Sequence, residues 1–356
     1  FVQEVADDYA KARASFEGRG DTKLLPLAQA REARHRIDWA GYVPPAPKWL
    51  GVRRFERYDL AEIARFIDWT PFFQSWELYG RYPAILQDEV VGESARALWA
   101  DAQTMLKQLI DQNWLQASAV IGLFPAHSVN HDDIEIRDPD TGAARMTWVG
   151  LRQQLAKATK DGSAANPDWA LADFIAPAES GVQDYIGTFA VTGGLGIDPH
   201  VARFEAANDD YSAILLESIA DRLAEAFAER MHQRVREEFW GYQPDEQLDN
   251  DALIAEKYVG IRPAPGYPAC PEHTEKSTLW ELMDVQSRTG IELTESMAMW
   301  PGAAVSGWYF SHPQSQYFVV GRLAQDQVAD YAKRKGWTLA EAERWLSSNL
   351  GYNPED

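Results

Sequence analysis

The stretch DIEIRDPDTGAARMTWV, residues Asp133 to Val149, decides the fold class of this chain. Ile134 and Ile136 alternate with polar neighbours, which is the period-two pattern of a half-buried strand. A turn is expected from Asp138 to Gly142, and a second strand is expected from Met146 to Val149. The pattern therefore predicts a β-hairpin, whose two strands are antiparallel.

The same reasoning, applied outward from this hairpin, predicts a mixture of strands and helices. Further strands are expected at Ala119 to Phe124 and Asp184 to Gly194, and a second hairpin within Gly307 to Leu323, with its turn near His312 to Ser315. Helical spacing of apolar residues predicts helices at Leu60 to Ile67, Ser94 to Ile110, Tyr211 to Trp240 and Leu279 to Arg288, the last closed by Gly290. Two more helices are expected at the end, the first stopped by Gly336 and the second begun by a Thr338–Glu341 capping box. Runs of strands and helices, without strict alternation, favour an α+β fold with an antiparallel sheet.

Length and composition set limits on the class of protein. With 356 residues, both one large domain and two closely joined lobes are possible. Hydrophobic residues make up 46% and aromatic residues 12%, which is a globular composition. The net charge of −20 disfavours nucleic acid and would attract cationic ligands, although solubility alone also explains it.

The single cysteine and the lack of long apolar runs exclude other classes. One cysteine cannot form an internal disulfide or a multi-cysteine metal site. No apolar run approaches the roughly 20 residues that a membrane helix needs, and the start does not resemble a signal peptide. We therefore expect a cytoplasmic protein with no membrane partner.

The first 36 residues differ from the remainder of the chain. They are charged and helical in pattern, with apolar rows too sparse for deep burial, which is typical of a linker. Because the chain begins with Phe1 and not Met, we expect it to be a piece of a longer polypeptide. The predicted division is a linker at residues 1–36 and a compact body at residues 37–356.

The proline-rich stretch IRPAPGYPACPEH, Ile261 to His273, is the candidate ligand wall. Its prolines favour extended backbone without regular pairing, so the carbonyls of Arg262 and Ala264 are expected to be free for a ligand. Gly266 allows a positive φ or a close backbone approach, Arg262 offers a fork for a carboxylate, and Tyr267 offers a ring and a hydroxyl. A rigid connector between lobes explains the composition equally well.

Other polar motifs carry less information. HSVNHDD, from His127 to Asp133, is interpreted as an exposed polar turn, and the Cys270 and His273 pair lacks partners for a tetrahedral metal site, so no metal is expected. No spacing rule identifies a catalytic residue. Three acids are interpreted from sequence alone as solvated or capping carboxylates: Asp68, Glu225 and Glu256.

Longer strings resemble a known family, the C-terminal activation domain of cobalamin-dependent methionine synthase. They are RPAPGYPACPEHTEK (from Arg262), ESMAMWPGAAVSGWYFSHP (from Glu295), DWTPFF (from Asp68), LADFIAP (from Leu171), AVTGG (from Ala190) and KRKGWTLAEAERWLSSNLGY (from Lys333). The resemblance extends from about Ile37 to Tyr352. It implies a single α+β domain with a twisted antiparallel sheet flanked by helices, and it implies that residues 1–36 follow a cobalamin-binding domain.

The resemblance also implies a ligand, S-adenosylmethionine, and a set of binding residues. In the family the motif arginine holds the carboxylate of the ligand, which assigns that role to Arg262, and backbone near Ala264 holds the adenine. The acid of DWTPFF would take the amino group. The implied binding residues are Asp68, Arg262, Ala264, Gly266, Tyr267, Tyr317 and Phe318, with Glu225 and Glu256 as acids near the ligand. His273 and the loop from Trp300 to Ser306 would lie toward the cobalamin.

The implied function is reductive reactivation of the methyltransferase. One electron from flavodoxin or a similar reductase reduces cob(II)alamin, and S-adenosylmethionine then methylates it. The protein positions the donor, so no catalytic side chain is implied. Cobalamin and zinc would be held by other domains, and this piece alone is not expected to synthesise methionine. Because flavodoxins are acidic, docking requires a basic patch, either Arg53 with Arg54 or Lys333 to Lys335.

Two other classes compete with this hypothesis. An acidic, tryptophan-rich glycosidase or sugar-binding module predicts two carboxylates facing each other across a cleft. A pure interaction scaffold predicts that the proline stretch is only a spacer. Binding of S-adenosylmethionine would separate the three.

Overall fold

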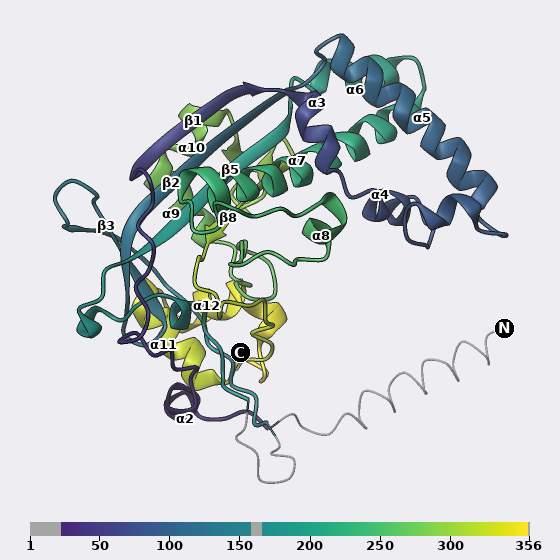
Figure 1. Cartoon of the computed structure of the whole chain (residues 1–356). Helices are drawn as coiled ribbons and strands as arrows, with labels where there is room; N and C mark the ends of the chain where they lie inside the picture. The colour runs from purple at the N-terminus through teal and green to yellow at the C-terminus, as the bar shows by residue number, and fades with distance from the viewer. Residues whose placement is uncertain (1–22, 158–165, 355–356) are drawn as a thin grey trace, which may run out of the picture.

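The long strand β2 (Gln116–Val129) is the centre of a six-stranded antiparallel sheet (Figure 1). In the computed structural model, which describes residues 23–157 and 166–354, the main path of the sheet is β4-β3-β2-β5-β8. β1 pairs with the first half of β2 and β3 with its last residues, both on the edge opposite β5. The other strands are β1 (Gly51–Tyr58), β3 (Asp133–Arg137), β4 (Ala144–Trp148), β5 (Asp184–Leu195) and β8 (Ala304–Tyr309), and a separate pair is formed by β6 (Glu292–Leu293) and β7 (Met299–Trp300).

Helices surround this sheet. They are α2 (Leu27–Glu32), α3 (Leu60–Ile63), α4 (Thr70–Ser75), α5 (Gly92–Asp111), α6 (Asp198–Ala206), α7 (Asp210–Arg234), α8 (Asn250–Ile254), α9 (Glu275–Met283), α10 (Val285–Thr289), α11 (Gln325–Lys335) and α12 (Leu339–Trp345). Short 3-10 turns are η1 (Ala64–Phe66), η2 (Ala84–Gln87), η3 (Leu171–Phe174), η4 (Ala178–Ser180) and η6 (Ser347–Asn349), and a π-helical turn, η5 (Val235–Phe239), extends α7. The mixture of helices with an antiparallel sheet confirms the α+β prediction.

The β-hairpin predicted within Asp133 to Val149 is present. β3 and β4 pair antiparallel, with Ile134 opposite Trp148. Gly142 in the turn has φ +71°, a conformation that side-chain-bearing residues rarely adopt. Ile134 and Ile136 are fully buried, as the alternation predicted.

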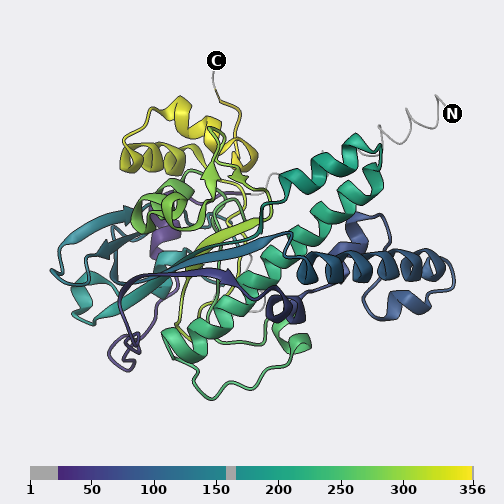
Figure 2. The same cartoon turned by 90° about the horizontal axis from the view of Figure 1, so that it is seen from above.

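Two hydrophobic layers cover the faces of the sheet. α7 packs on β5 and β8 and shares one core with α5, represented by Phe189, Leu223 and Phe227. The other face is covered by α9, α10 and η3, in a core around Phe124 and Trp308. A third small core joins α11 and α12, and Figures 1 and 2 place these helices at the end of the sheet away from α4 and α5.

The second hairpin, expected within Gly307 to Leu323, is absent. β8 forms, but after Phe310 the chain does not return as a strand. The edge where a return strand would pair is taken by the proline-rich segment: Phe310 and Ile261 exchange two backbone hydrogen bonds, and Trp308 N donates to Pro263 O at 2.9 Å. That prediction was therefore wrong because a segment distant in sequence competes for the same edge.

Two further expectations need correction. The predicted helix from Leu279 to Arg288 is divided at Asp284, which has φ +52°, although Gly290 closes it as expected. In the N-terminal segment, Leu27 and Ala30 of α2 are buried, so shallow burial was wrong there. Residues 1–22 of the predicted linker lie outside the described residues.

Candidate ligand-binding site

Two adjoining cavities, of about 370 and 180 Å³, lie beside the proline-rich segment. They share three lining residues, Glu225, Glu256 and Arg262. The larger is also lined by Phe189, Pro263, Ala264, Tyr267, Pro268, Ala269, Val305, Tyr317, Phe318 and Val319. The smaller is also lined by Phe66, Asp68, Pro71, Arg222, Ala226, Glu229, Leu253 and Ile254. One cavity is therefore mostly apolar and the other mostly charged, and Arg262 lies between them.

The proline-rich segment forms a tight turn against β8. Tyr267 N donates to Ala264 O at 3.1 Å, with Pro265 and a positive-φ Gly266 (φ +97°) at the two central positions. This is the residue pattern of a type II turn. A Cβ on Gly266 would lie 2.3 Å from the His273 ring, so glycine is required both for backbone conformation and for space. The expected positive φ and close approach at Gly266 are confirmed.

Another glycine brings the segment close to the sheet. A Cβ on Gly307 of β8 would lie 2.5 Å from Pro263 O, the carbonyl that accepts from Trp308 N. The Ala264 carbonyl is likewise used within the chain, by Tyr267 N. The turn therefore uses one of the two lone pairs of the Ala264 carbonyl, and the other stays available to a ligand.

Arg262 is held by several side chains at once. Its Nη2 lies 2.6 Å from Glu229 Oε2, and its Nη1 donates to Tyr258 Oη at 3.0 Å and lies 3.2 Å from His232 Nδ1. Burial alone would lower the pKa of Arg262, but the Glu229 carboxylate and nearby phenols raise it above its ordinary value. The guanidinium is therefore charged and oriented before any ligand arrives.

Polar residues on the buried side of α7 complete the surroundings of Arg262. Burial raises the pKa of Glu225. The pKa of His232 lies well below its ordinary value, first because the ring is buried and second because the positive charges of Arg236 and Arg262 are close to it. His232 is thus neutral and can accept a hydrogen bond from Arg262 through Nδ1. Its ring stacks on Tyr309 of β8, with centroids 5.1 Å apart, which fixes its orientation.

The structure brings eight of the nine sequence-predicted site residues to the two cavities. Asp68 lines the smaller one; Ala264, Tyr267, Tyr317 and Phe318 line the larger one; Glu225, Glu256 and Arg262 line both. Gly266 does not line either cavity but shapes the turn between Ala264 and Tyr267. Tyr317 Oη accepts a hydrogen bond from Arg262 N at 3.0 Å, which ties the two predicted segments together.

Sequence reasoning missed three residues around Arg262: Glu229, His232 and Tyr258. A signal was available for the two on α7, because Glu225, Glu229, His232 and Arg236 recur at helical spacing. A polar row on a helix that is otherwise apolar on several sides indicates a buried polar contact.

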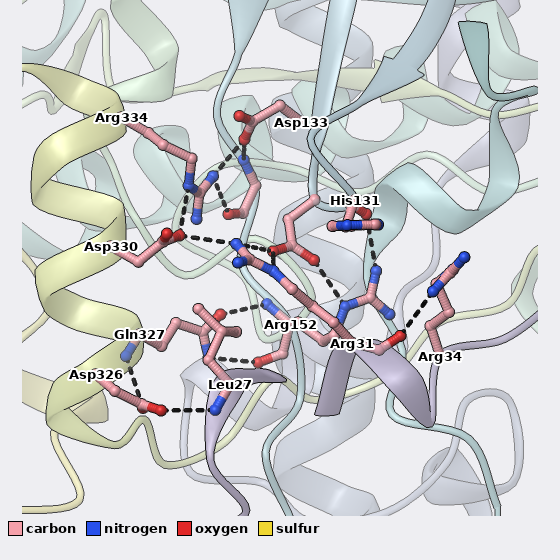
Figure 3. A network of polar contacts seen from close by, with 12 residues as sticks. Leu27, Arg31, Arg34, His131, Asp133, Arg152, Asp326, Gln327, Asp330 and Arg334 are labelled. Carbon is pink, nitrogen blue, oxygen red and sulfur yellow. Dashed lines mark hydrogen bonds and ion pairs between the residues drawn. The ribbon is translucent and has the colours of Figure 1, made fainter. Parts of the chain in front are cut away.

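A second polar cluster lies outside these cavities and contradicts one expectation (Figure 3). Asp132 and Asp133 of HSVNHDD are buried, although an exposed turn was predicted. Arg152 Nε donates to Asp132 at 2.7 Å, and Arg334 of α11 binds Asp133. The buried Arg152 and the partly exposed Arg334 of the distant helix α11 thus compensate the charges of these buried carboxylates.

The described residues offer neither a metal-binding cluster nor a membrane-spanning helix. In residues 23–157 and 166–354, no group of three or more histidine, cysteine, aspartate or glutamate side chains is arranged to hold a metal ion. Within the same residues, no helix has both the length and the apolar character needed to cross a membrane.

Comparison with known proteins shows similarity to a described family and to solved structures. A sequence model of the family described as "Vitamin B12 dependent methionine synthase, activation domain" matches residues 59–336. A solved structure, the crystal structure of the MetH reactivation domain bound to AdoHcy, is similar with 53% sequence identity and a TM-score of 0.88. That similarity covers 93% of this chain and 100% of the other.

Proposed function

This chain belongs to the family of vitamin B12-dependent methionine synthase activation domains, and we propose that it binds S-adenosylmethionine in the two adjoining cavities. Bound there, S-adenosylmethionine supplies a methyl group on a positively charged sulfur for reactivation of cobalamin. The family match gives no support to the sugar-binding module or to the pure scaffold.

The observation that carries the proposal is the charge pattern around Arg262. One guanidinium lies between an apolar cavity and a smaller cavity lined by four carboxylates, those of Asp68, Glu225, Glu229 and Glu256. S-adenosylmethionine has one carboxylate, one ammonium and one sulfonium, together with an adenosine ring system. A single fixed arginine suits the carboxylate, several acids suit the two cationic groups, and an apolar cavity suits the rings.

Each predicted residue then has a positioning role. We assign Arg262 to the carboxylate of the ligand and Asp68 to its ammonium, with backbone near Ala264 at the adenine. Tyr317 and Phe318 would contact the ligand in the larger cavity, and Glu225 and Glu256 would face the cationic end. The side chains hold and orient the ligand, so no general base or nucleophile is needed.

The proposal includes partners that act on the exposed side of the site. We assign residues 1–36 to a linker from a cobalamin-binding domain and residues 37–356 to the activation domain, with His273 and the loop from Trp300 to Ser306 facing that partner. Flavodoxin or a similar reductase would supply the electron. The chain belongs to a methyltransferase family, and we expect that it does not synthesise methionine by itself, since cobalamin and zinc would be held by other domains.

Calorimetric titration with S-adenosylmethionine tests the proposal directly. We expect saturable binding by the native chain, and about a 10- to 100-fold loss for Arg262→Ala, because a charged hydrogen-bond partner of the carboxylate is removed. Arg53→Ala, which removes an exposed arginine of β1, is the matched control and should bind like the native chain. Absence of binding by the native chain would refute the proposed function; equal affinity of both variants would refute the role of Arg262.

A further inference from the structure

Glu229 has a carboxylate oxygen for which the described protein provides no partner. Its side chain is buried, with the residue 7% exposed, and its Oε2 forms the ion pair with Arg262 at 2.6 Å. Its Oε1 is buried and accepts no hydrogen bond within the described part of the chain. A buried carboxylate oxygen left in this state is costly, so such an atom calls for an explanation.

The surroundings restrict what could donate to that oxygen. Glu229 lines the smaller cavity together with the acids Asp68 and Glu225 and with Arg222, whose guanidinium contacts Asp221. The hydrogen bonds of Arg262 Nη1 go to Tyr258 and toward His232, and Nη2 contacts the other oxygen of Glu229. No side chain of the described residues donates to Oε1, and Glu229 lines the smaller cavity, so a molecule bound there can supply the donor, preferably a positively charged one.

We infer that Glu229 is a positioning and specificity residue that contacts the ammonium of the ligand directly and acts on its carboxylate through Arg262. Through Oε2 it holds the guanidinium that receives the carboxylate of the ligand, and through Oε1 it accepts a hydrogen bond from the ammonium, beside Asp68. This inference rests on the proposed binding of S-adenosylmethionine and adds a residue to which neither the sequence motifs nor the family resemblance assigned a role.

The charge balance supports a direct contact. The guanidinium compensates one of the four carboxylates that line the smaller cavity, and Arg222 is the other cation of that lining. An ammonium entering this cavity therefore meets an excess of negative charge. A ligand without an amino group would leave Glu229 Oε1 unpaired, so the residue would discriminate between the two kinds of ligand.

Paired titrations of Glu229→Gln test the inference. The substitution keeps the shape and an oxygen that can accept from Arg262, but removes the charge. We expect S-adenosylmethionine to bind roughly 10- to 100-fold more weakly, as for a lost hydrogen bond to a charged group. Methylthioadenosine, which has the adenosine and the sulfur but no amino-acid tail, should bind with unchanged affinity, a result that general damage to the pocket would not give.

Control variants keep the outcome decisive. Glu217→Gln removes the same charge from an exposed position of α7 and should leave both affinities unchanged. If Glu229→Gln does not fold, Glu229→Asp replaces it, since this variant retains the charge but withdraws the carboxylate by one methylene and should weaken only S-adenosylmethionine. Equal affinities of native and variant chains, or equal weakening of both ligands, would overturn the inference; failure of the native chain to bind S-adenosylmethionine would overturn the proposed function instead.

Discussion

Asp184, the first residue of β5, is a buried carboxyl that no cation neutralises in the described structure. It is 3% exposed, and its oxygens accept hydrogen bonds from the backbone N–H groups of Ala176 and Tyr185. Burial outweighs these two bonds and raises the pKa of Asp184 to about 7. The folded protein therefore keeps this proton at pH values where the unfolded chain has lost it.

This shift predicts how stability depends on pH. Because the folded-state pKa of this acid is raised, its contribution to stability is full below the unfolded pKa of about 4 and is lost as the pH rises through about 7. Asp184→Asn does not titrate. We expect the difference in free energy of unfolding, native minus variant, to be about 1 kcal/mol larger at pH 6 than at pH 8.

Chemical denaturation of both proteins at the two pH values measures that difference. Histidines with lowered pKa values, such as His312, act in the opposite direction but contribute equally to both proteins, so the comparison removes them. A difference that does not change between pH 6 and pH 8 would show that Asp184 is ionised in the folded state.

At the scale of single residues, the site was largely predictable from motifs. Arg262, Asp68 and Tyr317 belong to strings that resemble a family, and the structure places them around two joined cavities. Glu229 and His232 were missed because residue type alone does not show that an acid or a histidine faces inward; their helical spacing with Glu225 and Arg236 was the available signal. Only the tertiary position of α7 against β5 and β8 makes these residues part of the site.

At the scale of elements, strands with local partners were predictable and strands with distant partners were not. The β3–β4 hairpin was predicted because its turn and both strands are contiguous in sequence. The expected return strand after β8 failed because the segment around Pro263, more than 40 residues earlier in the chain, occupies the edge beside Trp308. The competition depends on close backbone approach at Gly307, which no local pattern reveals.

The ion network of Figure 3 connects elements that are far apart in sequence. Arg31 of α2 binds both Asp132, after β2, and Asp330 of α11. Arg152 is fully buried and donates to Asp132, to both oxygens of Asp173 and to two backbone carbonyls. Its removal would leave Asp173 buried without its cationic partner, which is costly in a medium of low polarity.

Arg152→Ala should therefore lower the free energy of unfolding by about 3–5 kcal/mol, the usual cost of breaking a buried ion pair. Arg137→Ala is the matched control, since Arg137 pairs with Glu135 on the surface and should cost less than about 1 kcal/mol. Urea denaturation of the two variants measures both values. Similar losses for both would mean that the buried network contributes no more than a surface pair.

At the scale of the whole molecule, the distribution of positive charge restricts where an acidic reductase could dock. The net charge is −20, so an acidic partner needs a local basic patch. The two candidates are not equivalent. In the Lys333 to Lys335 cluster, Arg334 binds Asp133 and Asp330, and Lys335 binds Glu275, so their charges are already compensated. On β1, Arg53 and Arg54 are both exposed, and only Arg54 has an acidic neighbour, Glu56.

For flavodoxin, the electron donor proposed above, we therefore predict docking over β1. The double variant Arg53→Ala, Arg54→Ala should weaken association roughly 2- to 30-fold, as for the loss of two exposed ion pairs, and should reduce its dependence on salt. The matched control, Arg65→Ala with Lys333→Ala, removes two exposed positive charges elsewhere and should have little effect. Titration with flavodoxin at two ionic strengths measures both. Unchanged affinity of the β1 variant would place the docking site elsewhere. An equal loss of affinity in the control would mean that only the net charge of the protein matters for association.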